Sequence, residues 1–179
     1  AGEFMLAPTD VNGENPRPDL RPHVVNNSWG GDAGTPWYDH IVDAWMAAEM
    51  FPILSNGNSG PACGTAGTPA DGADAWGVGA YDQSGAIADF SARGAGRGGI
   101  KPDIAAPGVD VRSSVRNGGY AFYRGTSMAG PHQSAAVALL WSAAPWLIGE
   151  IEATKQILAD TAVPVDDTTC GGTPEHNNV

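Results

Sequence analysis

Short apolar runs alternate with stripes of apolar residues at helical spacing along most of the chain. Two runs, at residues 24–29 and 52–55, are bounded by glycine and polar residues and have the length of buried strands. Shorter apolar runs at residues 76–80 and 104–106 predict a third and a fourth strand.

A helix is predicted between the first two strands. The pair Thr35-Pro36 is a helix-start signal, an N-cap residue followed by proline in the first turn. Apolar residues then recur at helical spacing, at Trp37, Ile41, Ala44, Trp45 and Ala48. The acidic residues Asp39, Asp43 and Glu49 lie on the opposite side of the predicted helix. Two further helices are predicted over residues 128–143 and 151–159.

This alternation of strands and helices predicts the α/β fold class. Parallel strands joined by helices form a three-layer, doubly wound sheet with helices on both faces. Ligands of such sheets bind at the carboxyl ends of the strands. Ser28, Asn58 and Ser127 all lie near a predicted strand end or turn, so we expect the functional site there.

Composition narrows the class of protein further. The 179 residues fit one domain, and 42% hydrophobic content is enough for a core, although 25 glycines and 14 prolines indicate many loops. The net charge of −11 argues against partners such as nucleic acid and anionic membrane surfaces. No apolar run approaches the ~18 residues that suggest a membrane span. An acidic protein of this kind fits a secreted, extracellular location.

The candidate nucleophile is a serine between small residues at a helix start. It lies in the segment Gly125-Thr126-Ser127-Met128-Ala129-Gly130-Pro131-His132. Small neighbours let a substrate backbone approach the hydroxyl, and the free N–H groups of a helix N-terminus favour a developing oxyanion. The simpler alternative is that Ser127 only caps the helix.

Together with three other blocks, this segment resembles the subtilisin-like serine proteases, the subtilases. The blocks follow the family's order: VVNNSWGG at 24–31, PILSNGNSG at 52–60, and FSARG at 90–94 followed by KPDIAAPG at 101–108. The resemblance runs from about residue 24 to residue 162. It implies a subtilisin-like sheet and a serine endopeptidase that acts on polypeptide substrates.

The resemblance also implies a role for individual residues. Ser127 would attack the peptide carbonyl, and Asn58 would donate its side-chain amide to the oxyanion together with the Ser127 backbone N–H. The implied substrate contacts are an extended strand at Ser28, Trp29 and Gly30, one wall of the S1 pocket at Ser55, Asn56 and Gly57, and the pocket base at Gly67. P1 preference is left open. Ordinary turn roles for Asn58 and Gly67 are the competing interpretation.

Two parts of the family's catalytic triad have no counterpart. No Asp-Thr-Gly or Asp-Ser-Gly segment and no His-Gly-Thr-His segment precedes Val24. We therefore interpret residues 24–179 as the C-terminal part of a subtilisin-like peptidase domain whose N-terminal strands are missing. Residues 1–23 are interpreted as a lead-in, and residues 1–4 as a cloning scar.

No histidine in the chain has the surroundings of a general base. His132 follows Ser127 by five residues and so points about 140° away from it on a helix. His23, His40 and His176 have no motif around them. We expect the chain alone to have negligible protease activity.

Two other functions compete with this interpretation. Gly125-x-Ser127-x-Ala129, followed by Asp160, Asp166 or Asp167 and then His176, has the residue order of an α/β-hydrolase esterase, but the run before Gly125 is short for a central strand. The other function is a non-catalytic scaffold that complements the missing half of the domain. Without that half, the strand at 24–29 would be an unpaired edge, which predicts a homo-oligomer.

The remaining candidate sites concern cysteines and metals. Cys63 and Cys170 allow a disulfide or two free thiols, and a secreted enzyme favours the disulfide. Two cysteines without a nearby histidine are too few ligands for zinc. Asp71 and Asp74 offer two carboxylates, too few for calcium, so we assign no metal and no cofactor.

Overall fold

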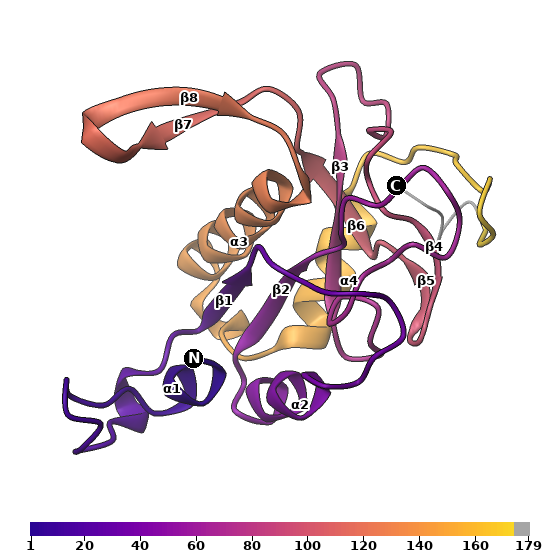
Figure 1. Ribbon diagram of the computed structural model, residues 1–179. Coiled ribbons are helices and arrows are strands. Elements are labelled where there is room, and N and C mark those ends of the chain that lie inside the picture. Colours follow the sequence, from indigo (N-terminus) through magenta and orange to yellow (C-terminus); the bar gives the residue numbers. More distant parts are fainter. Residues whose placement is uncertain (174–179) are drawn as a thin grey trace.

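The computed structural model describes residues 1–173 and is built around a parallel sheet of four strands (Figure 1). The order across this sheet is β1-β2-β3-β6. The four strands are β1 (Val24–Asn27), β2 (Phe51–Ser55), β3 (Trp76–Tyr81) and β6 (Ile104–Pro107). All three strand pairs are parallel, and β1 pairs with β2 in the register Val25↔Pro52.

Helices cover both faces of the sheet, which confirms the three-layer α/β prediction. Helix α3 (Thr126–Ala143) contacts all four strands, and α2 (Asp39–Ala47) contacts β2. Because side chains alternate between the faces of a strand, Phe51 and Ile53 of β2 point towards the α3 side, and Leu54 packs with Val42 of α2.

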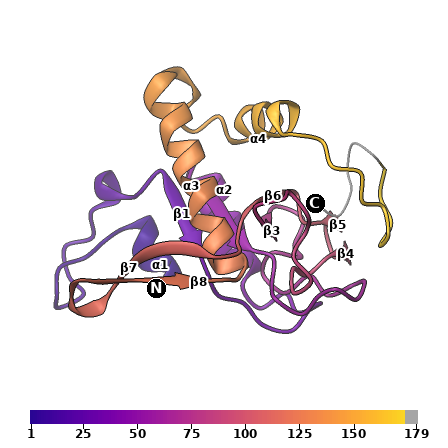
Figure 2. The same ribbon diagram turned by 90° about the horizontal axis from the view of Figure 1, so that it is seen from above.

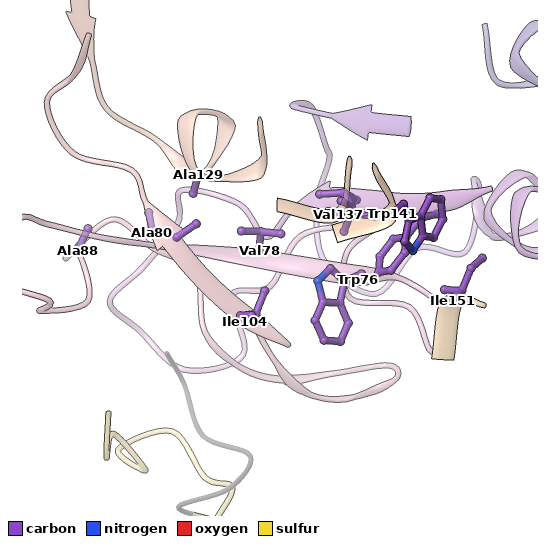
Figure 3. Packing of buried hydrophobic residues seen from close by; sticks show 12 residues of the cluster. Trp76, Val78, Ala80, Ala88, Ile104, Ala129, Val137, Trp141 and Ile151 are labelled. Atoms are coloured by element: carbon purple, nitrogen blue, oxygen red, sulfur yellow. The ribbon is translucent and has the colours of Figure 1, made fainter. Parts of the chain in front are cut away.

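The larger core lies between the sheet and helix α3 (Figure 3). Trp76 and Val78 of β3 pack there with Val137 and Trp141 of α3, and each of these side chains is at most 7% exposed. Helix α4 (Ile151–Thr161) adds Ile151 to the same cluster. This continuous apolar layer fixes the position of the helix that begins at the candidate nucleophile.

Two predicted boundaries were wrong. Strand β1 ends at Asn27, and helix α2 begins at Asp39 rather than at Thr35-Pro36. The Thr35 hydroxyl donates to the Asp32 carbonyl within a turn, so it caps no helix. Trp37 therefore lies outside the helix and is 54% exposed.

Two antiparallel hairpins were not predicted from the sequence. The first joins β4 (Gly94–Gly96) to β5 (Gly99–Lys101). The second joins β7 (Val111–Val115) to β8 (Gly119–Tyr123) through a turn, η2 (Arg116–Gly118). Figures 1 and 2 both show the second hairpin projecting from the body of the molecule beside α3. Its residues have little apolar periodicity because almost none of them is buried.

The first residues pack against the body of the protein. Helix α1 (Gly2–Leu6) contacts α2, Gly2 is buried, and the Trp45 indole N–H donates to the Gly2 carbonyl at 3.1 Å. A short 3-10 turn, η1 (Pro18–Leu20), follows before β1. The origin of residues 1–4 stays a prediction, but these residues do have a place in the fold.

The C-terminal segment is tied back to the loop after β2. It comprises the 3-10 turn η3 (Pro145–Leu147), helix α4 and the residues that follow it. A disulfide joins Cys63 to Cys170, and Arg93 lies 3.6 Å from the Asp167 carboxylate. Within residues 1–173, no helix is long and apolar enough to cross a membrane.

Candidate active site

Ser127 lies in the first turn of α3, which begins at Thr126, two residues earlier than predicted. Gly125 occupies the N-cap position with a φ of 148°, a conformation that favours glycine, and no side chain caps the helix. The Ser127 hydroxyl instead donates to the Ser28 carbonyl at 3.3 Å, and the Ser28 hydroxyl donates to the Ser127 carbonyl at 3.0 Å. Ser127 is therefore not the helix cap of the simpler alternative. Its half-exposed hydroxyl lies beside the segment that follows β1.

Asn58 is held against the same turn by the residue before the serine. Its Oδ1 accepts hydrogen bonds from the Thr126 backbone N–H at 2.9 Å and from the Thr126 hydroxyl at 3.1 Å. Because a backbone N–H can only donate, the atom facing it must be the carboxamide oxygen. The amide nitrogen of Asn58 consequently points away from Thr126.

Two hydrogen-bond donors are left free beside the nucleophile. Within residues 1–173, neither the Asn58 Nδ2 nor the Ser127 backbone N–H forms a hydrogen bond, and the latter is typical of first-turn N–H groups of a helix. Both lie where the positive end of the α3 dipole favours negative charge. A pair of amide donors next to a serine hydroxyl can stabilise a tetrahedral oxyanion.

The backbones of three segments approach one another closely, at residues 30–31, 56–57 and 67–68. The Gly31 N–H donates to the Thr68 carbonyl at 2.9 Å, and the Gly67 N–H donates to the Asn56 carbonyl at 2.9 Å. A Cβ on Gly30 would come within 2.8 Å of the Thr68 carbonyl oxygen, so this approach requires glycine. The three segments that were predicted to surround the S1 pocket are thus neighbours in space.

The side chains of the predicted pocket wall point away from solvent. Ser55 is 6% exposed and Asn56 is fully buried, with its amide donating to the Ala92 carbonyl at 2.6 Å. Any substrate contact of these two residues therefore comes from their backbone. Trp29 is 41% exposed and stacks edge-on against Tyr38 at 4.7 Å between ring centroids.

The described histidines lie apart from the nucleophile. The His132 Nδ1 is 2.8 Å from the Met128 carbonyl, a contact within α3. His23 packs edge-on against Trp141, and His40 lies beside Tyr38. His176 lies outside the described residues. Across residues 1–173, no histidine forms a hydrogen bond with Ser127.

The Asp71 carboxylate is already occupied by an arginine. Arg97 binds Asp71 at 2.9 Å and also pairs with Asp39, while the Gly34 N–H donates to the same Asp71 side chain at 2.7 Å. Within residues 1–173, no group of three or more His, Cys, Asp or Glu side chains could hold a metal ion.

Sequence reasoning missed the contribution of Thr126. Its hydroxyl is buried, accepts the Gly57 N–H at 3.3 Å and donates to Asn58, so it connects the end of β2 to the start of α3. Its only sequence signal was its position directly before Ser127.

Comparison with known proteins decides the family. The family model described as the subtilase family matches residues 9–178. The chain belongs to the subtilase family. It is 44% identical to bacillopeptidase F of Bacillus subtilis (strain 168) over 98% of this chain, and 39% identical to alkaline elastase YaB of Bacillus sp. (strain YaB) over 82% of it. The α/β-hydrolase interpretation was therefore wrong.

Solved subtilase structures share its fold. The S41 psychrophilic protease superposes with a TM-score of 0.71 and is 31% identical, over 83% of this chain. The prenylagaramide maturation protease PagA superposes with a TM-score of 0.70 and is 28% identical, over 88% of this chain. The chain spans only part of these subtilases: 52% of the S41 protease, 58% of PagA, 13% of bacillopeptidase F and 36% of alkaline elastase YaB.

Proposed function

We propose that this chain supplies the nucleophile and the oxyanion donors of a secreted serine endopeptidase. The observation that supports this proposal most directly is the pair of hydrogen bonds from Thr126 to the Asn58 Oδ1, which hold Asn58 against the residue directly before Ser127. The substrate is a polypeptide. It would lie as an added strand along Ser28, Trp29 and Gly30, which are all exposed.

In the proposed reaction, the Ser127 Oγ attacks the scissile carbonyl carbon. The hydroxyl proton passes to a general base, the carbonyl oxygen becomes an oxyanion, and the Asn58 amide and the Ser127 N–H bind it. Collapse of the tetrahedral intermediate expels the amine, which takes up the proton, and leaves an acyl-enzyme that water hydrolyses.

We propose that the general base and its carboxylate come from residues outside this chain. The Ser127 hydroxyl donates to a backbone carbonyl, a weak proton acceptor, and His23, His40 and His132 are engaged elsewhere. On its own the chain then has negligible protease activity. A segment carrying an aspartate and a histidine would restore it by packing on the free side of β1.

The test is hydrolysis of a chromogenic peptide by the chain alone and by the chain co-expressed with the complementary part of the S41 protease domain. We expect no turnover by the chain alone and measurable turnover by the pair, lost on Ser127→Ala. Turnover by the chain alone that vanishes in Ser127→Ala would refute the external base. Turnover by the pair that survives Ser127→Ala would refute the role of Ser127.

The competing proposal is a non-catalytic scaffold. The free edge of β1 favours association in either case, because the sheet order places β1 at one end with β2 as its only partner in residues 1–173. The two functions differ in one result: a scaffold gives no turnover with any complementing segment.

A further inference from the structure

The hairpin formed by β7, η2 and β8, residues 111–124, concentrates positive charge in an acidic protein. We call these residues the basic hairpin. They contain three of the nine Lys and Arg residues, Arg112, Arg116 and Arg124, and none of the 20 Asp and Glu residues. The rest of the chain has the other six Lys and Arg residues and all 20 Asp and Glu residues, so its net charge is −14, whereas that of the basic hairpin is +3.

The arginines of the basic hairpin are free to bind a partner. Five of the other cations form ion pairs: Arg17, Arg93, Arg97, Lys101 and Lys155. Arg112, Arg116 and Arg124 form no ion pair within residues 1–173.

Aromatic side chains accompany these charges on one face of the basic hairpin. Directly opposed residues of an antiparallel pair share a face, and Arg112 opposes Phe122 while Ser114 opposes Tyr120. The Arg112 guanidinium lies 4.1 Å from the centre of the Tyr120 ring. Tyr120 and Phe122 are 62% and 64% exposed. Arginine, tyrosine and phenylalanine are the residue types that protein interfaces favour.

The base of the basic hairpin is fixed to the candidate active site. The Gly125 N–H donates to the Gly108 carbonyl at 2.9 Å, and the Gly108 N–H donates to the Tyr81 carbonyl at 3.0 Å. Strand β8 ends at Tyr123, and Arg124 and the Gly125 N-cap follow it directly into the turn of Ser127. The base of the basic hairpin therefore adjoins the turn that carries Ser127.

We propose that the basic hairpin is a docking surface for acidic stretches of the polypeptide substrate. That the bound segment belongs to a substrate rests on the proposed function. The guanidinium groups of Arg112, Arg116 and Arg124 pair with Asp and Glu carboxylates, and Tyr120 and Phe122 cover the aliphatic parts of the bound segment.

The charge of the whole molecule favours an acidic peptide over other polyanions. Nucleic acid and anionic bilayers present charge over a wide area, which the acidic remainder of the protein repels. A short acidic peptide contacts only the basic hairpin and stays within about one Debye length of it, ~8 Å at physiological salt.

The test measures binding, so it does not depend on hydrolysis. Fluorescence anisotropy of the 179-residue chain is recorded with a dye-labelled Glu-rich decapeptide and with the same peptide carrying Gln for Glu. We expect tighter binding of the Glu peptide and a decrease with added salt. We expect this binding to weaken about tenfold in a triple variant, which carries Arg112→Gln, Arg116→Gln and Arg124→Gln. A change of this size corresponds to the loss of roughly three exposed ion pairs.

A matched control removes the same charge elsewhere. Arg17→Gln, Arg21→Gln, Lys155→Gln also deletes three cations, and we expect less than a twofold change. Equal weakening by both triple variants, or equal binding of the Glu and Gln peptides, would overturn the proposal. Tighter binding of a DNA duplex or of phosphatidylserine vesicles than of the Glu peptide would also overturn it. Turnover by the complemented enzyme is a separate readout, so failure of docking leaves the protease proposal standing.

Discussion

At the scale of single residues, the candidate active site depends on how Asn58 is oriented. The Thr126 N–H and hydroxyl both bind its carboxamide oxygen, so its amide is directed before any substrate arrives. Preoriented donors of this kind stabilise charge without a reorganisation cost during the reaction. Gly30 and Gly67 act differently, because each lets two backbone segments approach more closely than a Cβ would allow.

Asn58→Ala tests the oxyanion role in the complemented enzyme. We expect kcat to fall about 10²–10³-fold with KM little changed, the effect known for the corresponding asparagine of a subtilisin. Ser59→Ala, a change at the next exposed residue of the same loop, is the control and leaves both constants unchanged. A similar loss in both variants would indicate a damaged loop rather than a lost donor.

Gly67→Ala tests the close approach at the predicted pocket base. A Cβ there would lie 2.9 Å from the Gly31 carbonyl oxygen, so the backbone must shift. We expect a loss of about 1–3 kcal/mol in the free energy of unfolding, measured by urea denaturation. Gly119→Ala meets only ordinary contact with Val115 and changes stability by less than about 0.5 kcal/mol. Equal stability of the two variants contradicts this.

At the scale of elements, Arg97 fastens three segments that are distant in the sequence. It follows β4 and binds Asp39 at the start of α2 and Asp71 in the loop after Gly67. The same loop supplies the carbonyl of Thr68 to Gly31. This cluster therefore supports the predicted pocket from its outer side.

The cluster predicts a loss of stability in acid. Hydrogen bonding to Arg97 holds the pKa of Asp39 below its ordinary value, so its stabilising effect is complete above the unfolded pKa of about 3.9 and is lost as pH falls through the lower folded pKa. We expect the difference in unfolding free energy between the native chain and Asp39→Asn to shrink below about pH 4. Asp43→Asn, on the exposed side of the same helix, is the control. A difference that does not change with pH would contradict the assignment.

Most helices and strands of the molecule, but not all of them, could be predicted from the sequence. Buried runs and a helical stripe identified β1, β2, β3, β6 and the three long helices, because burial imposes a period on apolar residues. The β7–β8 hairpin escaped detection because its strands bury almost nothing. Helix α2 was placed too early because Thr35 bonds to Asp32 in a turn instead of capping the helix.

The candidate site shows a similar limit. Ser127, Asn58, Gly30, Gly57 and Gly67 were predicted from local motifs and their resemblance to the subtilases. Thr126 and Arg97 were not, since their partners lie 68 and 26 or more residues away along the chain and no local pattern records such contacts.

At the scale of the whole molecule, the sheet has a free edge. Strand β1 pairs with β2 on one side, and the described residues supply no strand for the other side. Unpaired N–H and C=O groups along an exposed strand are a template for pairing with another chain.

This edge predicts self-association of the isolated chain. We expect size-exclusion chromatography with light scattering to show dimers or larger species that increase with concentration. Asn26→Lys places a charge on β1 and shifts the protein towards monomer, whereas Asn12→Lys adds the same charge in an exposed turn and does not. A stable monomer at the highest soluble concentration would contradict this prediction.

The hydrogen bond between Gly125 and Gly108 also bears on which parts of this chain can vary. The chain leaves the body at one glycine and returns at the other, and the intervening loop of strand is almost entirely exposed. Insertions, deletions or replacement of residues 111–123 would leave the core cluster untouched, because no residue of β7 or β8 is buried, whereas Val109 packs against the core and must be kept. Variation in this protrusion can therefore change the surface offered to a partner while the turn that carries Ser127 keeps its position.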